Sequence, residues 1–352
     1  GPQTATCTSR ALPTYIRKKL RAYVEGVGGR LDRTNLNQHE AEVNKLIRKE
    51  ILKLDHFLGS ELKRICPHPE ELKSEDEARR FIDAHRGIVE RAFSGTTLAL
   101  VLVNIEQRLS WAACVGDSSV GLATTDSDGT VVGQRLCDFH TFKDPKEYFR
   151  VCMEHSSVEN PLFDWDDRLL GWMSVARAIG DFALKLPSAY LANLFQHLGF
   201  ECEPPMSTYI PKIISPPYMT AEPSVRFTDL QTFWTNGTKL FLYTDGVDGL
   251  VDGSLLFTPQ KSSGADPIQI VAELLATDID PHVEQVLGHE VEPRWSRENE
   301  NRAMDVMGNL LGGKNVDRLE MATDQRRLSN VDKSSWPFHV DDTTIIVWTL
   351  DV

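Results

Sequence analysis

The sequence predicts an α+β fold, because helix-like and strand-like segments occur in blocks along the chain rather than in strict alternation. Helical spacing dominates the first ninety residues, whereas strand-like segments separated by turn residues follow Ser94-Gly95. This order favours antiparallel sheets over a doubly wound parallel sheet. With 352 residues and 41% apolar content, the chain can bury a substantial core.

Three amphipathic helices are expected before residue 94. The first has apolar residues at every fourth position: Leu12, Ile16, Leu20 and Val24. This spacing places Pro13 in the first turn of the helix, where a proline is tolerated. Similar apolar spacing predicts a long helix over residues 43–65 and a third helix over residues 75–93.

Strands are expected in two groups. Segments rich in Val, Thr, Leu and Ala predict the first group at 96–105, 109–115 and 119–124. The second group is expected at 224–227, 239–243 and 344–350. Asp126-Ser127-Asp128-Gly129 lacks the liganding spacing and the terminal Glu of a calcium loop, so a hairpin turn is the better interpretation.

Two further helices are expected in the second half of the chain. The first covers residues 267–276, and the second covers 298–311 with Gly312-Gly313 as its stop signal. No internal repeat and no low-complexity linker marks a domain boundary. A single domain over residues 1–352 is therefore predicted, with loop and helical insertions near 186–216 and 253–335.

Charge and composition exclude several classes of partner. The formal net charge of −13 opposes both nucleic acid and anionic membrane surfaces, so neither is expected to bind. No apolar run approaches the roughly 18 residues of a membrane-spanning helix. The six cysteines form no C-x-x-C pair and are interpreted as reduced thiols, which favours an intracellular location. The sequence does not indicate an oligomeric state.

Carboxylates occur where apolar segments meet turns. Asp245 follows the apolar run 240–243, although Asp-Gly alone is more typical of a hairpin turn. Asp341 and Asp342 precede the apolar segment 345–348, which is expected to form a buried strand, and at its start their mutual repulsion has a cost unless a cation offsets it. A solvated strand entrance is an equally open interpretation of this pair.

Two more acids occupy similar junctions. Asp117 lies between two expected strands, and Asp181 follows Arg177-Ala178-Ile179-Gly180. Carboxylates from distant parts of the chain suit a site for hard divalent cations such as Mg²⁺ or Mn²⁺, which prefer oxygen ligands.

Five short segments occur in a characteristic order: Ser94-Gly95-Thr96-Thr97, Gly116-Asp117-Ser118-Ser119, Arg177-Ala178-Ile179-Gly180-Asp181, Thr244-Asp245-Gly246 and Asp341-Asp342-Thr343-Thr344. In this order they resemble the signatures of the protein phosphatase 2C family. The resemblance runs from about residue 90 to the C-terminus, with a weaker helical match before it.

Within that family the chain looks most like the branch that contains mitochondrial pyruvate dehydrogenase phosphatase. Segments 167–171, 215–223 and 341–344 carry this narrower likeness. The likeness implies a location in the mitochondrial matrix.

The family resemblance implies a fold of two stacked antiparallel sheets flanked by helices, a four-layer αββα sandwich. It also implies two Mg²⁺ or Mn²⁺ ions and hydrolysis of phosphoserine or phosphothreonine in a phosphoprotein substrate by a metal-activated water. By the same resemblance Asp245 and Asp341 are direct metal ligands, and Asp117 belongs to an additional metal. Gly246 and Asp342 are further candidate ligands. Arg177 and Asp181 support the site.

The chain also departs from the family pattern. It contains no early Asp-Gly-His-Gly-Gly segment, which in the family supplies a bridging aspartate and a candidate general-acid histidine. We therefore expect an N-terminally truncated domain without its first strands, which binds metal weakly and hydrolyses slowly. Ser119 replaces a usual arginine, and Val247-Asp248-Gly249 replaces a Leu-Trp-Asp-like stretch. The alternative is a pseudophosphatase, a regulatory binding module that keeps the fold without the chemistry.

Overall fold

The structure is a computed structural model that describes residues 1–350 except 160, 201, 253–262, 297–299, 325 and 327–340. The chain divides into two compact units. The first unit comprises Gly1–Leu98, Ala113–Asp117 and Asp138–Phe227, and the second comprises Ala99–Ala112, Ser118–Cys137 and Thr228–Val352. That the whole chain forms a single domain stays a prediction.

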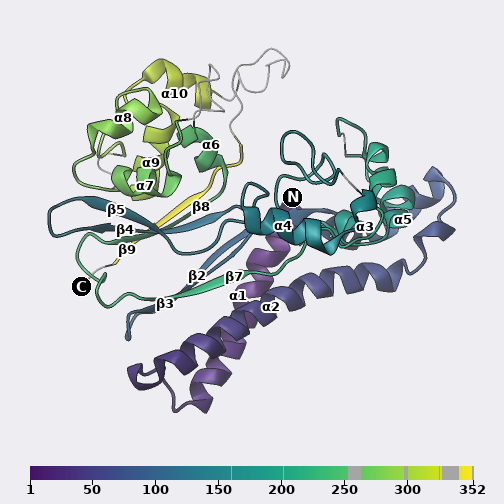
Figure 1. Cartoon of the computed structure of the whole chain (residues 1–352), viewed down its shortest axis with the longest axis horizontal. Coiled ribbons are helices and arrows are strands. Elements are labelled where there is room, and N and C mark those ends of the chain that lie inside the picture. Colours follow the sequence, from purple (N-terminus) through teal and green to yellow (C-terminus); the bar gives the residue numbers. More distant parts are fainter. Residues whose placement is uncertain are drawn as a thin grey trace. The chain divides into compact units, whose positions relative to one another are not determined.

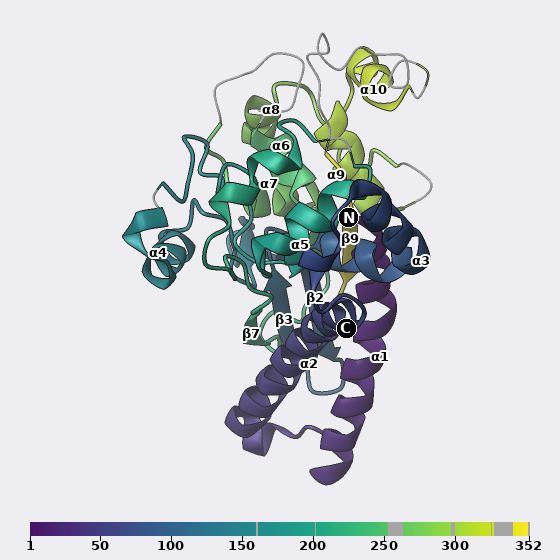
Figure 2. The same cartoon turned by 90° about the vertical axis from the view of Figure 1, so that its right-hand side faces the viewer.

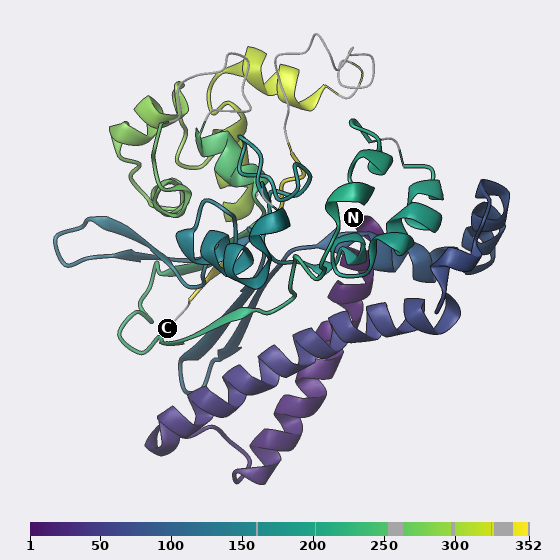
Figure 3. The same ribbon diagram turned by 45° about the vertical axis from the view of Figure 1, so that its right-hand side comes forward.

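Three long helices dominate the first unit: α1 (Pro2–Gly26), α2 (Leu36–Ile65) and α3 (Glu75–Phe93). They contact one another, and α1 and α2 run side by side in Figures 1, 2 and 3. Each presents an apolar stripe to its neighbours, as the spacing predicts. The side chain of Ser74 accepts a hydrogen bond from the Glu77 N–H at 3.3 Å and so caps α3.

The start of α1 differs from the prediction. Pro2 begins the helix and Pro13 lies inside it, so placing Pro13 in the first turn is wrong. The buried stripe continues towards the N-terminus through Thr4 and Thr8, which are not apolar and were therefore not counted. The Thr4 hydroxyl is satisfied there because it donates to the carbonyl oxygens of Arg91 and Ser94 at 2.9 and 2.6 Å.

The remainder of the first unit is built from short elements. Strand β1 (Gly95–Thr96) pairs antiparallel with β6 (Ile179–Gly180). The helices α4 (Pro145–Glu154) and α5 (Ser188–Asn193) follow in loop-rich segments. Short 3₁₀ helices occur at Arg33–Asn35, Pro69–Glu71, Ser157–Glu159, Phe182–Leu184, Phe195–His197, Met206–Thr208 and Ile210–Lys212.

A three-stranded sheet has the order β2 (Leu98–Asn104), β3 (Leu109–Val115), β7 (Ser224–Asp229). The central strand β3 is buried at every position, which agrees with its apolar and small residues.

The second unit contains a four-stranded antiparallel sheet in the order β5-β4-β8-β9. Its strands are β4 (Ser119–Thr125), β5 (Val131–Arg135), β8 (Lys239–Tyr243) and β9 (Ile345–Thr349). Asp126 to Gly129 form the expected hairpin turn between β4 and β5, with Gly129 at φ 89°.

Helices of the second unit gather on one side of this sheet in Figure 1. They are α6 (Gly246–Asp252), α7 (Pro267–Leu274), α8 (Pro281–Leu287), α9 (Arg302–Leu311) and α10 (Val316–Thr323). Fully buried side chains such as Phe241, Val247, Leu250 and Val271 join sheet and helices into one apolar core. The predicted start of a helix at residue 298 lies outside the described residues.

The apolar composition of residues 345–348 predicts a buried strand, but strand β9 is only partly buried. It is the edge strand of its sheet, and Ile346 and Trp348 are 56% and 36% exposed. An edge strand has a partner on one side only, so its apolar side chains are covered less completely.

The cysteine prediction is partly wrong. Cys7, Cys66, Cys152 and Cys202 are free thiols, but Cys114 and Cys137 are disulfide-bonded. Spacing along the sequence does not tell whether thiols come within bonding reach, because that depends on the tertiary fold.

Helices and antiparallel sheets occur in blocks, so the predicted α+β class is confirmed. Stacking of the sheets into a four-layer αββα sandwich stays a prediction. Among the described residues, no helix has the length and apolar content needed to cross a membrane.

Candidate metal centre

Asp245 stands where strand β8 leaves the sheet of the second unit. The strand buries Phe241 and Tyr243, and helix α6 starts at the next residue, Gly246. The turn is fixed by two backbone hydrogen bonds, from Val247 N–H to the Thr244 carbonyl at 3.0 Å and from Gly249 N–H to the Asp245 carbonyl at 3.2 Å. The Asp245 side chain is exposed at this edge of the sheet.

The segment before β9 meets Asp245 because β8 and β9 pair antiparallel, with Tyr243 opposite Ile345. Thr244 N–H donates to the Thr344 carbonyl at 3.1 Å, and Thr344 N–H donates to the Thr244 hydroxyl at 2.9 Å. The same hydroxyl donates to the Asp342 carbonyl at 3.0 Å. Two distant motifs are thereby clamped together at one sheet edge.

Gly246 makes this approach possible. A Cβ placed on Gly246 would lie 2.2 Å from the Thr343 hydroxyl, 3.0 Å from the Asp342 carbonyl oxygen and 3.2 Å from the Asp341 carbonyl oxygen. Any larger residue would therefore push the two segments apart. The glycine of the Thr244-Asp245-Gly246 motif has a packing reason in addition to its candidate role as a ligand.

We call Asp245, Asp341 and Asp342 the acidic edge. The pKa of Asp245 is raised from its ordinary value, first by desolvation, then by the charge of Asp341 and to a smaller extent by that of Asp342. Asp341 and Asp342 are exposed, and the Asp341 carboxylate accepts the Asp342 N–H at 2.8 Å. The acids repel one another in the absence of a cation.

Next to the acidic edge, four polar residues from separate segments of the chain lie close together, a proximity that the sequence does not indicate. Tyr243 donates a long hydrogen bond of 3.5 Å to Asp248, and Arg135 hydrogen-bonds the buried Ser119 hydroxyl. Burial raises the pKa of Asp248 to about 7, opposed by the charge of Arg135 and increased by that of Asp245. The two departures from the family pattern, at 119 and 247–249, therefore belong to one neighbourhood.

In the first unit three other motifs converge. Gly95 pairs with Gly180 across β1 and β6, and a Cβ on Gly95 would lie 1.7 Å from an Asp181 carboxylate oxygen. Gly116 has φ 91°, and a Cβ on it would lie 2.5 Å from the methyl group of Thr97. Asp117 follows Gly116 directly and is buried. These glycines let the three motif segments approach within contact distance.

Arg177 forms the centre of a closed cluster with Glu147, His140 and Gly116. Its Nε donates to both carboxylate oxygens of Glu147 at 3.1 Å, and its Nη1 donates to the Glu222 carbonyl at 2.8 Å. Burial acts to raise the pKa of Glu147, but the hydrogen bonds and charge of Arg177 lower it overall. Arg177 thus holds together segments of the first unit, and its predicted role as a support of the metal site stays a prediction.

His140 joins this closed cluster to the Gly116-Asp117 turn. The ring nitrogen Nδ1 of His140 accepts a hydrogen bond from the Gly116 N–H at 3.2 Å. The backbone N–H of His140 donates to the Gly116 carbonyl at 3.0 Å. Burial and the charge of Arg177 lower the pKa of His140 to about 4, so the imidazole is neutral at pH 7.

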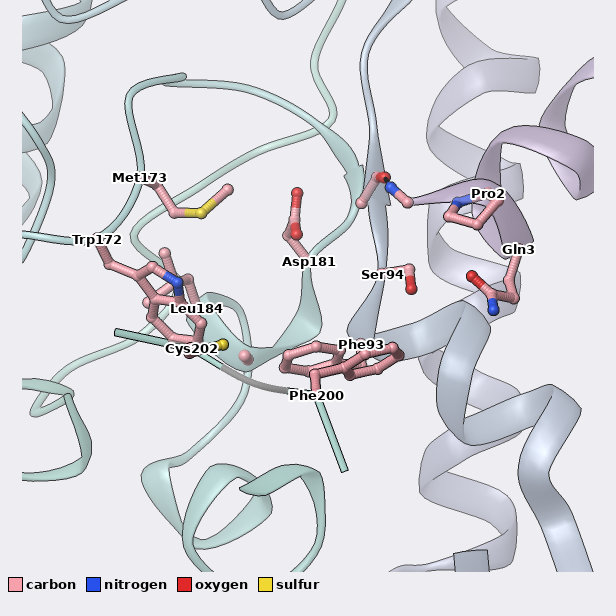
Figure 4. A pocket seen from close by; sticks show the side chains of 13 residues that line it. Pro2, Gln3, Phe93, Ser94, Trp172, Met173, Asp181, Leu184, Phe200 and Cys202 are labelled. Atoms are coloured by element: carbon pink, nitrogen blue, oxygen red, sulfur yellow. Dashed lines mark hydrogen bonds between the residues drawn. The ribbon is translucent and has the colours of Figure 1, made fainter. Parts of the chain in front are cut away.

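Asp181 points into a cavity of about 350 Å³ (Figure 4). Phe93, Met173 and Phe200 contribute to its apolar lining. Burial raises the pKa of Asp181 to about 6, opposed by the charge of Lys185 and increased by that of Asp55. Lys185 forms an ion pair with Asp55 at 2.8 Å. Asp181 therefore lies in the first unit with Arg177, and its supporting role stays a prediction.

The donors at the acidic edge suit a hard divalent cation. The carboxylates of Asp245 and Asp341 are oxygen donors, and a nearby cation would offset the repulsion that contributes to the raised pKa of Asp245. However, no group of three or more His, Cys, Asp or Glu side chains that could hold a metal ion occurs among the described residues. The donor chemistry fits, but the set is smaller than the about six oxygens that Mg²⁺ takes.

Sequence reasoning missed Glu147, His140 and Arg135. Each is an isolated polar residue outside the five motifs, and its partner lies at least sixteen positions away in the sequence. Of these three residues, Glu147 has a local sequence feature: it follows Asp144-Pro145, which is typical of a helix start, and it lies in the first turn of α4.

Comparison with protein families gives one match. Residues 10–247, more than half of the chain, match the model of the family described as Protein phosphatase 2C.

Curated relatives match over a shorter segment. Mitochondrial pyruvate dehydrogenase (acetyl-transferring) phosphatase 1 of Bos taurus is 28% identical over 163 residues, which is 46% of this chain and 29% of that protein. Phosphatase 2 of the same name from Homo sapiens is 29% identical over 160 residues, which is 45% of this chain and 28% of that protein. The chain thus matches less than a third of the length of these relatives.

Two solved structures are also similar. A serine-threonine phosphatase 2C from Toxoplasma gondii has a TM-score of 0.47 at 9% identity and covers 92% of this chain and 77% of its own. A sex-determining protein from C. elegans has a TM-score of 0.39 at 15% identity, with coverages of 82% and 51%.

Proposed function

Because the chain belongs to the protein phosphatase 2C family, we propose that it takes part in metal-dependent hydrolysis of phosphoserine or phosphothreonine. The observation that carries this proposal is the acidic edge, where β8 and β9 bring Asp245 and Asp341 together. The relatives named as pyruvate dehydrogenase phosphatases support a phosphoprotein substrate and a mitochondrial location.

Asp245 and Asp341 would hold the metal, with Asp342 and the Gly246 carbonyl as further candidate donors. A bound Mg²⁺ or Mn²⁺ would supply a Lewis acid and a water of lowered pKa. The chain's own contribution is to hold the two acids in register, through the paired hydrogen bonds of Thr244 and Thr344.

The first unit supports the proposal in a different way. Arg177, Asp181 and Asp117 belong to three motif segments that contact one another through glycines. In this proposal Arg177 and Asp181 maintain the backbone that carries Asp117, and Asp117 contributes to an additional metal.

Phosphate release from a phosphothreonine peptide in the presence of Mn²⁺ tests this proposal. The Asp245→Asn variant should reduce the Mn²⁺-dependent rate by at least tenfold, since even second-shell partners of metals contribute about 10–100-fold. Asp278→Asn is the matched control, because Asp278 is exposed in the second unit and has no hydrogen bond or ion pair among the described residues. Equal rates in the two variants would contradict the proposal.

A regulatory module that binds phosphoprotein without hydrolysing it is the second candidate. It is favoured by the small number of potential ligands that the described residues bring together. Binding of the phosphopeptide without phosphate release at saturating Mn²⁺ would support this candidate. Mn²⁺-dependent turnover that Asp245→Asn abolishes would exclude it.

A further inference from the structure

A second polar site lies in the second unit, at the opposite end of strand β8 from the acidic edge. A cavity of about 170 Å³ opens beside Lys239, the first residue of β8. Asp245 follows Lys239 by six residues, so the two residues are roughly 20 Å apart along the strand direction at about 3.3 Å per residue. The two sites are therefore separate.

The lining of this cavity is cationic. It contains the basic residues Lys239, Arg294 and Arg302 and the hydroxyl residues Thr277 and Thr349, and its other lining residues are apolar. No carboxylate belongs to the lining among the described residues. Three basic residues around one cavity contrast with a chain whose formal net charge is −13.

The walls of the cavity are fixed by Arg302, the first residue of helix α9. Its guanidinium donates to the backbone carbonyl oxygens of Leu275 at 2.7 Å, Ala276 at 3.2 Å and Pro293 at 3.1 Å. It also forms an ion pair with the buried Asp305 at 2.5 Å. On the other side Lys239 pairs with Thr349 in the β8–β9 ladder. The site is built on the sheet and two helices.

Two of the three cations remain uncompensated. The charge of Arg302 is balanced by Asp305, whereas within the described part of the chain the Lys239 ammonium donates to the uncharged Gly237 carbonyl at 2.8 Å and forms no ion pair. Arg294 is exposed and has no ion pair or hydrogen bond within the described part of the chain. Burial and then the charge of Arg302 lower the pKa of Lys239, so an anion beside the ammonium would be stabilised by its charge.

The size of the cavity limits its ligand. Its volume of about 170 Å³ corresponds to about six water molecules at about 30 Å³ each, and it is below the roughly 300–1,000 Å³ of sites for larger organic ligands. One tetrahedral oxyanion fills such a space, and two cations with two hydroxyls match its charge and its acceptor oxygens.

We propose that this cationic cavity binds a phosphate dianion, either free or as the phosphomonoester group of a small molecule. Lys239 and Arg294 supply the charge, and Thr277 and Thr349 supply hydroxyl donors. This site does not depend on the proposed metal-dependent hydrolysis, because it uses no residue of the acidic edge.

Titration calorimetry with the full chain tests the proposal. The protein is freed of metal, and inorganic phosphate and O-phosphoserine are titrated separately at constant ionic strength against a chloride blank. Saturable binding of phosphate is expected, and Arg294→Gln and Lys239→Gln should each weaken it by tenfold or more, since hydrogen bonds to charged groups contribute strongly. Tighter binding of O-phosphoserine would identify a phosphomonoester as the ligand, and equal or weaker binding would identify free phosphate.

Matched controls separate the cavity from general charge effects. Lys49→Gln removes the same charge from an exposed lysine of helix α2, and Asp245→Asn alters only the acidic edge. Both should bind phosphate as the wild-type chain does, and thermal unfolding confirms that all variants are folded. No saturable binding up to about 10 mM, or an equal loss in Lys49→Gln and Arg294→Gln, would overturn the proposal.

Discussion

The closed cluster and the acidic edge have opposite electrostatic arrangements. In the closed cluster of the first unit, the buried Glu147 is paired with the partly buried Arg177, and the pKa of Glu147 is lowered. At the acidic edge of the second unit, like charges face one another, and the pKa of Asp245 is raised. One arrangement is complete within the described part of the protein, whereas the other would be stabilised by a cation.

This difference distinguishes structural from functional acids. Arg177 lies in one of the five motifs but its partner Glu147 lies in none, so the order of the motifs alone does not identify which acids are structural. The sign of the electrostatic interaction does identify them, because a carboxylate paired with a guanidinium is stabilised, whereas a carboxylate held among other carboxylates lowers stability in the absence of a cation. The predictions below test each side of the comparison.

The largest effect is expected at the closed cluster. Arg177→Ala leaves the 4%-exposed Glu147 side chain without its main partner, which should lower the free energy of unfolding by about 3–5 kcal/mol in urea denaturation. Arg64→Ala breaks an ion pair to Glu61 whose side chains are 63% and 31% exposed, and should cost less than about 1 kcal/mol. Similar losses in both variants would show that the cluster is not structural.

The closed cluster should also lose stability in acid. The pKa of His140 falls from 6.5 to about 4 on folding, so the unfolded chain takes up a proton that the folded chain does not. The stability is complete above pH 6.5 and is lost as the pH falls towards 4, by at most about 3 kcal/mol. His140→Asn keeps a hydrogen-bond acceptor for Gly116 but does not titrate, so its stability should depend less on pH in this range. An unchanged pH dependence in this variant would count against the assignment.

A steric test addresses the clamp at the acidic edge. Gly246→Ala places a methyl group against the Thr343 hydroxyl and two backbone carbonyls, and should lower the free energy of unfolding by about 1–3 kcal/mol. Removing the hydroxyl contact by Thr343→Ala in the same chain should restore part of this loss. Gly26→Ala, where nothing lies within 4 Å, is the control in the same denaturation experiment. If Gly246→Ala is as stable as this control, the close approach is wrong.

The smallest effect is expected from charge at the acidic edge. Because the pKa of Asp245 is raised on folding, ionisation of this carboxyl lowers stability as the pH rises through its folded value. In metal-free buffer at pH 7, Asp245→Asn should therefore raise the melting temperature slightly, and the difference should vanish at acid pH. The direction is opposite to that of the His140 effect. A lower melting temperature for Asp245→Asn at pH 7 would contradict the raised pKa.

Local patterns in the sequence predicted much of this fold. The spacing of apolar residues located α2 and α3, and strand β8 has the predicted bounds. The order of the motifs identified Asp245 and Asp341 before any contact between them was known. These features succeed because helical periodicity, strand composition and turn residues are local properties.

The failures concern long-range contacts. Glu147 and Arg177 are 30 residues apart, and the sequence near Glu147 does not indicate which residue pairs with it. Thr4 was excluded from the buried face of α1 because a hydroxyl is polar, yet two carbonyls from the end of α3 satisfy it. Strand β9 was taken as buried because its composition does not show that it lies at a sheet edge. Each error depends on which segments meet in three dimensions.

The central claim is that the acidic edge is completed by a divalent cation. Thermal unfolding of the wild-type chain and of Asp245→Asn with increasing Mn²⁺ tests it most directly, because a cation that binds the folded state raises its melting temperature. Mn²⁺ should raise the melting temperature of the wild-type chain and leave that of Asp245→Asn nearly unchanged. An equal rise in both proteins, or none in the wild-type chain, would contradict the claim.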